Sequence, residues 1–254
     1  MVEVNAGHRR PATVVALDRI AELKGWRWAG DTLWLGAGLT YTEMLDPALA
    51  RLIPALTQAA RTVGSPQIRN AGTLGGNLGT ASPAGDTLPV LAALDAIVEL
   101  HGPAGRRDVR IQDFVIGPKH TSLDARELVV GVRVPVLRGH QEFRKVGVRN
   151  AMVIAVASMA FAADEQSRSV RCALGAVGPV PLRATDAEQW LASRIDWDHR
   201  VNASPGDLER FGHLVTQASR AIDDHRGTAA YRTHAVGVLA RRAAAHLFEP
   251  GPIQ

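Results

Sequence analysis

The chain has 254 residues, of which 46% are hydrophobic and 21% charged, and its formal net charge is +4. These values are typical of an ordinary globular protein with one large domain or two small ones. Basic residues are spread along the sequence and aromatic residues make up only 5%. The charge therefore favours an arginine-rich solvated surface over a nucleic-acid platform.

The sequence gives no sign of export or of membrane insertion. No apolar run approaches the roughly 18 residues that a membrane span needs, and the opening MVEVNAGHRR lacks the apolar core of a signal peptide. The single cysteine, Cys172, cannot form an internal disulfide, nor can it build an iron–sulfur or zinc site alone. We therefore expect a cytoplasmic protein whose redox chemistry, if any, uses another carrier.

The first predicted elements are a hairpin and a capped helix. Two short apolar-alternating runs within WRWAGDTLWL (residues 26–35) flank Gly30 and Asp31, which is typical of a tight hairpin. Thr40 then begins a helix, because its hydroxyl can accept from free amide groups while Glu43, three positions later, completes a capping box.

A second helix and a glycine-rich stretch follow. Apolar residues recur at helical spacing over residues 48–64, and Gly64 is placed to end that helix. Residues 68–90, IRNAGTLGGNLGTASPAGDTLPV, then read as a loop that leads into a short helix with Asp86 or Thr87 at its N-cap.

Five further segments have the apolar content of strands. They are residues 96–100, Glu127–Val134, Glu142–Val148, Ala151–Ala162 and Ser169–Ala176. The last two are long and nearly continuous in apolar residues, so we expect them at the centre of a sheet.

The pattern becomes helical from Ala184 to the end of the chain. The proline-bearing stretch near Val134–Gly139 is the best candidate for a boundary. The sequence thus predicts an α+β protein with a first domain over residues 1–136, and a smaller antiparallel sheet-plus-helices domain over residues 140–250.

The glycine-rich loop is the main candidate binding site. Glycines remove Cβ atoms, so backbone N–H groups can converge on an anion, for which a phosphate is the natural choice. No Gly-Lys-Ser/Thr follows, and the segment follows a helix rather than a strand, which excludes a P-loop and a Rossmann motif. Taken alone, the glycines favour a tight structural loop over a phosphate site. The residues that would shape the site are Gly72, Thr73, Gly75, Gly76, Asn77, Gly79, Thr80 and Ser82.

Other polar clusters give weaker signals. The nine histidines lack the spacing of zinc ligands. The cluster Asp223–Arg226 precedes Gly227 and Thr228 at the start of the last helix, so helix capping and a salt bridge of Arg226 are favoured over catalysis.

The whole string SPQIRNAGTLGGNLGTASPAGDTLPVLAALDA is more specific than its glycines. It closely resembles the second flavin-binding loop of the molybdenum hydroxylase family, in the medium subunits of carbon monoxide and xanthine dehydrogenases. The stretches LWLGAGLTYTEM, IGPKHTSLDARELVVGVRVP, FRKVGVRNAMVIAVAS and IDDHRGTAAYRTHAVGVLARRAAAHL extend the resemblance over nearly the full chain. It implies a two-domain FAD-binding fold of the vanillyl-alcohol-oxidase-like type, truncated at its N-terminus.

The resemblance also implies which residues bind FAD. The pyrophosphate would lie on Thr73, Gly75, Gly76 and Asn77, with Thr80 and Ser82 on the same wall. Asp86 would bind hydroxyls of the ribityl or ribose portion, which is compatible with a role in capping the helix at Thr87.

Three more positions match residues near the flavin ring. Val129 matches an apolar position that packs near the isoalloxazine, and Ile154 a flavin-facing aliphatic one, although its strand pattern fits plain core equally well. Lys145 matches a lysine close to the flavin, where a positive charge would suit the reduced ring. The other interpretation of Lys145 is an exposed strand lysine.

By this resemblance the chain is an FAD-binding electron-transfer subunit. Its partners would be a small [2Fe–2S] subunit and a large molybdopterin subunit, in a dimer of heterotrimers. Electrons would pass from the clusters to FAD and on to an acceptor that the sequence does not identify. One alternative is a structural subunit of such a complex that has lost FAD, and another is a stand-alone flavin oxidase.

The start of the chain departs from the family pattern. The family carries a first glycine loop of the Ala-Gly-Gly-Thr-Asp type, and MVEVNAGHRRP resembles the sequence that follows it. We expect that the native polypeptide begins upstream of Met1 and includes that loop, the alternative being a genuine deletion.

Overall fold

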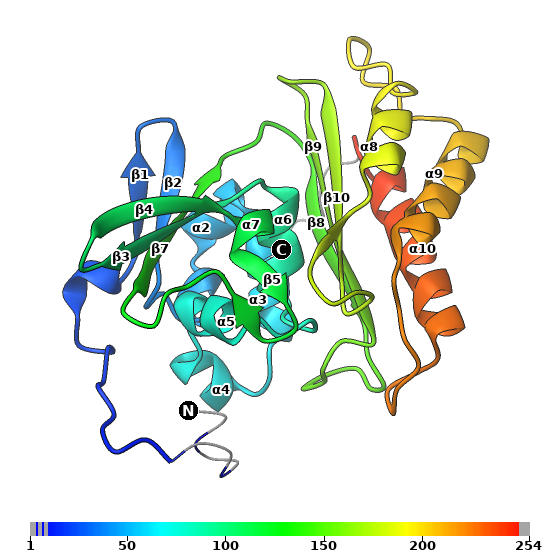
Figure 1. Ribbon diagram of the computed structural model, residues 1–254. Coiled ribbons are helices and arrows are strands. Elements are labelled where there is room, and N and C mark those ends of the chain that lie inside the picture. The colour runs from blue at the N-terminus through cyan, green and yellow to red at the C-terminus, as the bar shows by residue number, and fades with distance from the viewer. Residues whose placement is uncertain (1–3, 5–6, 8–9, 249–254) are drawn as a thin grey trace.

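The computed structural model describes residues 4, 7 and 10–248. Two antiparallel sheets with helices between and outside them make up this part of the chain (Figure 1). The proposed continuation upstream of Met1 concerns residues 1–11, most of which lie outside the described residues. Among the described residues, no helix has the length and apolar character needed to cross a membrane.

The first sheet has five strands in the order β1-β2-β7-β3-β4. Their bounds are β1 Trp26–Ala29, β2 Thr32–Gly36, β3 Ile97–Gly102, β4 Gly105–Arg110 and β7 Leu128–Pro135. The predicted hairpin is confirmed, since Trp26 pairs with Leu35 across a turn in which Gly30 has a φ of 68°. A positive φ costs glycine little, which is why this residue stands in the turn.

Short helices accompany this sheet, and among them η1, α5 and α7 contact its strands. Their bounds are η1 Ala21–Leu23, η2 Glu43–Leu45, α2 Pro47–Leu52, α3 Pro54–Thr62, α4 Pro66–Ala71, α5 Leu74–Thr80, α6 Thr87–Ala93 and α7 Ile111–Phe114. A two-stranded ribbon, β5 Val115–Gly117 and β6 His120–Thr121, follows α7. The hydrogen bonds of the predicted capping box are present, because the amide of Thr40 donates to Glu43 Oε2 at 2.7 Å and the amide of Glu43 donates to Thr40 Oγ1 at 3.2 Å. The helix itself is shorter than expected, since η2 has only three residues and its N-cap is Thr42.

The expected single helix over residues 48–64 is wrong. It is divided into α2 and α3 at Ile53, whose φ of −136° and ψ of 69° lie outside the helical region. Pro54 explains the break, because a proline lacks the N–H that would continue the helix and forces the preceding residue out of the α conformation.

The second sheet has four strands in the order β11-β10-β9-β8. Their bounds are β8 Gln141–Val146, β9 Ala157–Asp164, β10 Ser169–Gly175 and β11 Leu182–Arg183. The central position of β9 and β10 is as predicted, but β9 begins later than expected. Residues 151–156 form an irregular segment in which Met152 has a φ of 50° and the Arg149 guanidinium donates to the carbonyls of Ala151 and Met152.

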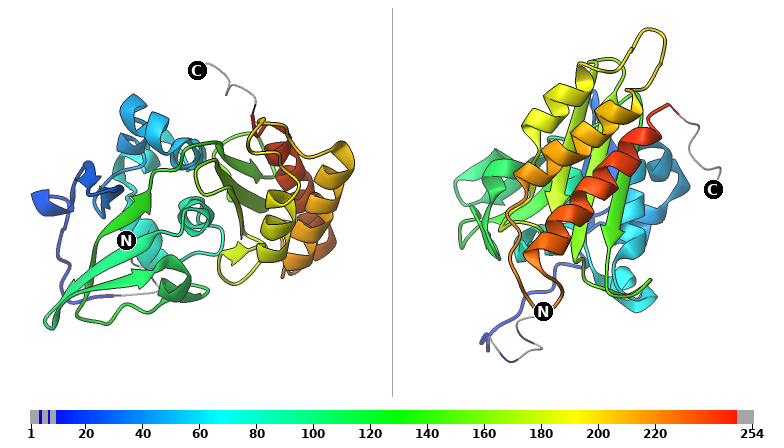
Figure 2. Two further views of the ribbon diagram at one scale, coloured as in Figure 1. Left: turned by 90° about the horizontal axis from the view of Figure 1, so that it is seen from above. Right: turned by 90° about the vertical axis from the view of Figure 1, so that its right-hand side faces the viewer.

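Three helices cover the outer face of the second sheet, and Figure 2 shows them side by side. They are α8 Thr185–Ala192, α9 Pro205–Ala218 and α10 Ala229–Ala245. The starts of α9 and α10 are capped by hydroxyls, since Ser204 accepts from the amide of Asp207 and Thr228 from that of Tyr231. Both caps satisfy amide groups that a helix start otherwise leaves unpaired.

Helix α6 lies between the two sheets, and every one of its 7 residues is buried. It packs against β9 and β10 on one side and α3 on another. The core around α6 includes Ala160, Ala162 and Ala173 from the second sheet, whereas the other face of that sheet forms a second core with α8, α9 and α10. The buried faces of β9 explain why its sequence is continuously apolar.

Candidate functional site

The glycine-rich stretch forms a helix rather than the expected loop. Residues Leu74–Thr80 are α5, and the side chain of Thr73 caps it by accepting a hydrogen bond from the amide of Gly76 at 3.0 Å. Glycines disfavour a helix, but Leu74 and Leu78 are both fully buried. Tertiary packing of these two leucines therefore overrides the local preference.

The amide groups at the start of α5 are already engaged. Leu74 donates to the carbonyl of Leu39 at 2.9 Å, and Gly75 donates to that of Ala37 at 2.7 Å. With Gly76 bound to Thr73, no amide of this turn is left to converge on an anion. The expected amide cradle is therefore wrong for this segment.

The glycines of α5 instead divide into a packed one and two open ones. A Cβ built on Gly75 would lie 2.7 Å from the Cβ of Ala37, so this glycine is needed for close packing. A Cβ on Gly76 would meet only Thr73 Oγ1, at 3.1 Å, and one on Gly79 would meet nothing within 4 Å. Gly76, Gly79 and Thr80 are exposed. This side of the helix is bare backbone that a ligand can approach closely.

Asn77 connects α5 to the start of α6. Its Oδ1 accepts a hydrogen bond from the hydroxyl of Thr87 at 2.5 Å. In the intervening turn, Ser82 Oγ accepts from the amide of Ala84 at 3.4 Å. These contacts fix the position of Asp86, the residue before Thr87, relative to the open face of α5.

Asp86 and Lys145 form a buried ion pair. The distance from Lys145 Nζ to Asp86 Oδ2 is 2.5 Å, and the two side chains are only 6% and 7% exposed. Burial raises the pKa of Asp86, although the charge of Lys145 opposes this effect. Lys145 is therefore not an exposed strand lysine, and the side chain of Asp86 does not cap α6.

Sequence reasoning missed two residues around this pair. Thr62, at the end of α3, accepts from Lys145 through its carbonyl at 3.2 Å and its hydroxyl at 3.4 Å. Tyr41 is buried, and its pKa is raised by that burial and then by the nearby charge of Asp86. Thr62 belongs to no motif. Tyr41 lies within the stretch LWLGAGLTYTEM that extends the family resemblance, but that stretch implied no role for it in the site.

The two predicted aliphatic positions differ in their surroundings. Val129 is half-buried on β7, and the carbonyl of its neighbour Val130 accepts from the amide of Ala37 at 3.1 Å, next to the start of α5. Ile154 lies in the irregular segment before β9 and is 63% exposed. The plain-core interpretation of Ile154 is therefore wrong, and this side chain is available to a ligand or partner.

A cavity of about 880 Å³ opens beside the ion pair. Lys145 and Thr62 line it together with Met152 and Val153 of the irregular segment, and Arg149 lies at the same wall. Of the ten predicted site residues, Lys145 is the one that lines this cavity. The structure thus joins α5 to Thr87 through Asn77, and joins the preceding residue, Asp86, to Lys145. Val129 lies close to α5, and Ile154 lies apart from these residues.

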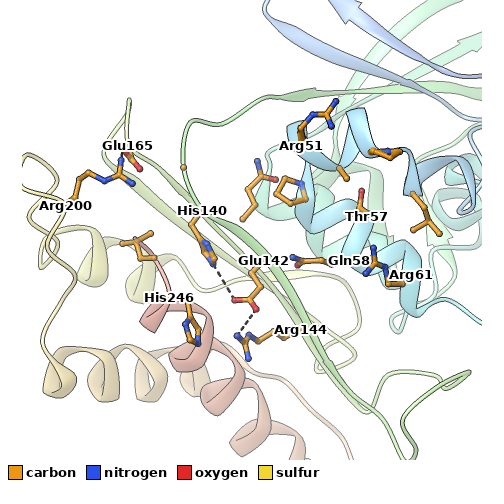
Figure 3. A pocket seen from close by; sticks show the side chains of 17 residues that line it. Arg51, Thr57, Gln58, Arg61, His140, Glu142, Arg144, Glu165, Arg200 and His246 are labelled. Carbon is orange, nitrogen blue, oxygen red and sulfur yellow. Dashed lines mark hydrogen bonds and ion pairs between the residues drawn. The ribbon is translucent and has the colours of Figure 1, made fainter. Parts of the chain in front are cut away.

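A larger cavity, of about 1150 Å³, lies at the other end of β8 and contains none of the ten predicted residues. Figure 3 shows Arg51 and Arg61 of α2 and α3 on one side of it, and His140, Glu142 and Arg144 on the other. Arg144 Nη2 lies 2.7 Å from Glu142 Oε1, and His140 Nε2 lies 3.5 Å from Glu142 Oε2.

The Glu142 cluster makes a pH-dependent contribution to stability. Burial acts to raise the pKa of Glu142, but the contacts with His140 and Arg144 outweigh it and hold the pKa below its ordinary value of 4.5. A carboxyl with a lowered folded-state pKa stabilises the fold above its unfolded-state pKa, and this stabilisation is lost as the pH falls through the folded-state value. We expect Glu142→Gln to unfold at lower urea concentration than the unmodified chain at pH 7. The difference should shrink below pH 4.5.

The control for this measurement is Glu165→Gln in the same cavity, because Glu165 forms a more exposed pair with Arg200 at 2.5 Å. Exposed pairs contribute little, so this variant should show only a small difference from the unmodified chain. A Glu142→Gln deficit that stays constant from pH 7 to about pH 3 would contradict the assigned role.

The remaining candidates are structural. Asp224 pairs with Arg226 and Arg232, and Asp223 Oδ1 accepts from the amide of Ala229 at 2.6 Å at the start of α10. The capping interpretation of this cluster is therefore confirmed. Cys172 is buried, and that burial raises the pKa of its thiol. Within the described part of the chain, no three His, Cys, Asp or Glu side chains are grouped as metal ligands.

Comparison with known proteins covers nearly the whole chain. Residues 1–137 match the family described as the FAD binding domain in molybdopterin dehydrogenase, and residues 141–247 match the CO dehydrogenase flavoprotein C-terminal domain. The glyceraldehyde dehydrogenase medium chain of Sulfolobus acidocaldarius is 32% identical over 92% of this chain and 82% of its own length. The carbon monoxide dehydrogenase medium chain of Hydrogenophaga pseudoflava is 29% identical over 92% and 81%.

Solved structures agree with the sequence matches. A structure of carbon monoxide dehydrogenase from Hydrogenophaga pseudoflava superposes with a TM-score of 0.83 at 28% identity, over 91% of this chain and 80% of that one. Quinoline 2-oxidoreductase from Pseudomonas putida superposes with a TM-score of 0.86 at 25% identity, over 97% and 85%. The FAD-binding fold with its C-terminal domain, expected from the sequence, is thus confirmed. This chain belongs to the FAD-binding medium subunits of the molybdenum hydroxylase family.

Proposed function

We propose that this oxidoreductase subunit transfers electrons within a larger complex, from [2Fe–2S] clusters on a partner chain to FAD and then to an external acceptor. The observation that carries the proposal is the single cysteine of a family member that binds FAD. A [2Fe–2S] cluster takes four protein ligands, so the clusters belong on another polypeptide. The partners are then a small iron–sulfur subunit and a large molybdopterin subunit, assembled as a dimer of heterotrimers.

The described residues fit FAD at two points. The bare side of α5 at Gly76 and Gly79 leaves room for a pyrophosphate to approach the backbone. The second point is Asp86 Oδ1, a buried acceptor without a hydrogen-bond partner, which suits a hydroxyl donor of the nucleotide. The residues proposed to line FAD are Thr73, Gly75, Gly76, Asn77, Thr80, Ser82, Asp86, Val129, Lys145 and Ile154.

The chain's own contribution is to hold and orient the cofactor. Bound FAD supplies the chemistry, because a flavin exchanges electrons one at a time or as a pair. The contacts of Asn77 with Thr87 and of Asp86 with Lys145 hold these polar side chains in fixed positions on the side of the proposed site. The aliphatic side chains of Val129 and Ile154 would exclude water from the two sides of the ring.

Electron exchange between flavin and clusters tests the proposal directly. The chain is purified in complex with its co-expressed partners, and the flavin is reduced by a flash of photogenerated deazaflavin radical. We expect flavin absorbance to recover while the cluster absorbance falls, and a complex stripped of FAD to show no such phase. A complex with full clusters and no flavin would favour the structural-subunit alternative, and a flavin that never exchanges with the clusters would refute electron transfer.

A further inference from the structure

The larger cavity, of about 1150 Å³, is lined by none of the ten residues proposed to bind FAD. Helices α2 and α3 form one of its walls, and β8 with the end of α10 forms the other (Figure 3). Its volume is comparable to that of pockets that hold small molecules. A ligand in this cavity would touch both halves of the chain.

Each of the two glutamates in the lining already has an arginine partner. Glu142 lies 2.7 Å from Arg144, and Glu165 lies 2.5 Å from Arg200. The lining contains four arginines in all, so the positive charge of the other two is not balanced by a carboxylate of the cavity. A hollow surface with an excess of one charge attracts ligands of the opposite charge.

The two other arginines, Arg51 and Arg61, belong to the wall formed by α2 and α3. Both are exposed, and among the described residues neither guanidinium has a hydrogen-bond or ion-pair partner. One face of α3 lines the cavity at the three- and four-residue spacing of neighbouring helical side chains, through Pro54, Thr57, Gln58 and Arg61. The unpaired charge therefore lies on one wall, opposite the ion pair of β8.

Gln58 adds a donor whose identity is fixed by the fold. Its Oε1 accepts a hydrogen bond from the backbone amide of Phe143 at 2.7 Å. Because a backbone N–H only donates, this bond identifies the oxygen and leaves the side-chain NH₂ group with two donors. That nitrogen has no partner among the described residues, and Figure 3 shows the side chain pointing from α3 into the cavity. Neutral and charged donors thus face the same space.

The lining also limits the kind of anion that fits. It contains no Phe, Tyr or Trp, so a nucleobase finds no aromatic platform on which to stack. Guanidinium groups, by contrast, match the oxygens of phosphates and carboxylates in charge and in geometry. A compact anion with several oxygens suits this lining better than a nucleotide.

We propose that this cavity binds a compact polyvalent oxyanion, a phosphate compound or a small polycarboxylate, through Arg51, Gln58 and Arg61. Phosphates and carboxylates present the same acceptor chemistry to these three donors. The site is independent of FAD, although Arg61 also borders the smaller cavity. Flavin content is therefore measured in every variant.

Isothermal titration calorimetry of the FAD-loaded complex, with its partner subunits and at constant ionic strength, tests the site. The probes are inorganic pyrophosphate and citrate, with acetate as the monovalent reference. We expect pyrophosphate or citrate to bind at least about tenfold more tightly than acetate, and the tighter of the two identifies the source of the oxyanion. Arg51→Gln and Arg61→Gln should each weaken that binding by about tenfold, the effect of losing one charged hydrogen bond.

Two variants change the affinity in opposite directions. Gln58→Glu keeps an oxygen for the amide of Phe143 but replaces the NH₂ group by a second carboxylate oxygen, so it should weaken binding by more than about tenfold. Glu142→Gln removes the charge that neutralises Arg144. We expect it to bind the same probe more tightly than the unmodified chain, although it lowers stability. A general loss of structure cannot produce this gain.

A matched control removes a complete ion pair from the same cavity. The double variant Arg200→Gln and Glu165→Gln leaves the net charge of the lining unchanged, and the Arg200 side chain is 56% exposed. Exposed pairs contribute little, so we expect the affinity for the probe to change by less than about twofold.

Three results would overturn the proposal. The first is equal affinity for pyrophosphate, citrate and acetate, or unchanged affinity in both Arg61→Gln and Gln58→Glu. The second is release of flavin during the titration, which would assign the anion to the FAD site. The third is a hexaglutamate peptide that binds more tightly than both probes, which would identify the occupant as an acidic segment of a protein.

Discussion

Gly76→Val should lower the affinity for FAD by more than about tenfold, or 1.4 kcal/mol, and leave the fold intact. The variant puts a branched side chain on the exposed side of α5, where only Thr73 Oγ1 lies within 4 Å of the new Cβ. Since glycine is a poor helix former, the free energy of unfolding of the flavin-free chain should change by less than about 1 kcal/mol. Flavin absorbance per complex and urea unfolding measure the two effects separately.

At the neighbouring Gly75, by contrast, the same substitution should lower the stability of the fold. Gly75→Val would drive its Cβ into Ala37, 2.7 Å away, and overpacking of this kind costs about 1–3 kcal/mol of stability. Gly79→Ala, with open space around its Cβ, should give a weaker form of the Gly76 effect. If Gly76→Val retains stoichiometric FAD at low free ligand, the open side of α5 is not where the pyrophosphate lies.

Phe211→Ala should lower the free energy of unfolding by about 3–5 kcal/mol, the usual cost of removing a buried aromatic side chain. Phe211 of α9 is fully buried and packs edge-to-face on Phe161 of β9, with ring centroids 6.1 Å apart. The space left by the removed ring would lie in the core on the outer face of the second sheet. FAD affinity should therefore be retained in whatever fraction stays folded.

Phe248→Ala is the matched control, because it removes the same side chain from a position that is only partly buried. Phe248 is only partly buried and contacts Trp197 at the end of the second core, so its removal leaves a gap that solvent can fill. We expect less than half of the loss seen for Phe211→Ala, measured by urea unfolding of the same complex. Equal losses at the two positions would show that the second core is not centred on the pair of Phe161 and Phe211.

The features that could be predicted from the sequence are those decided by near neighbours along the chain. The turn at Gly30 and the capping box of Thr40 with Glu43 depend on residues at most a few positions apart. The central strands were predictable for a related reason, since burial on both faces imposes a continuous apolar run. The break of the helix at Pro54 follows from the same local rules, because a proline interrupts a helix even where the apolar spacing around it is helical.

The site was harder to predict because its geometry depends on tertiary contacts. Helix α5 contradicts the preference of its own glycines, and it exists because Leu74 and Leu78 are buried beneath it. Asp86 and Lys145 are 59 positions apart, so no spacing rule could pair them, and Thr62 carries no motif at all. The resemblance implied all ten residues proposed to line the cofactor, but it did not indicate which of them contact each other.

Helix α6 limits how freely the two halves of this protein can be exchanged. Its buried surface packs against β9, β10 and β11 of the second sheet and against α3, α5 and α7 of the first half. The residue before it, Asp86, is joined to Lys145 of the second half. A chimera that joins the first half of one relative to the second half of another must therefore match the side chains of α6 to a foreign β9 and β10. The two halves match separate family models, but we expect that they cannot be exchanged freely between relatives. Substitutions in α6 and in the strands that it contacts should therefore occur together among relatives.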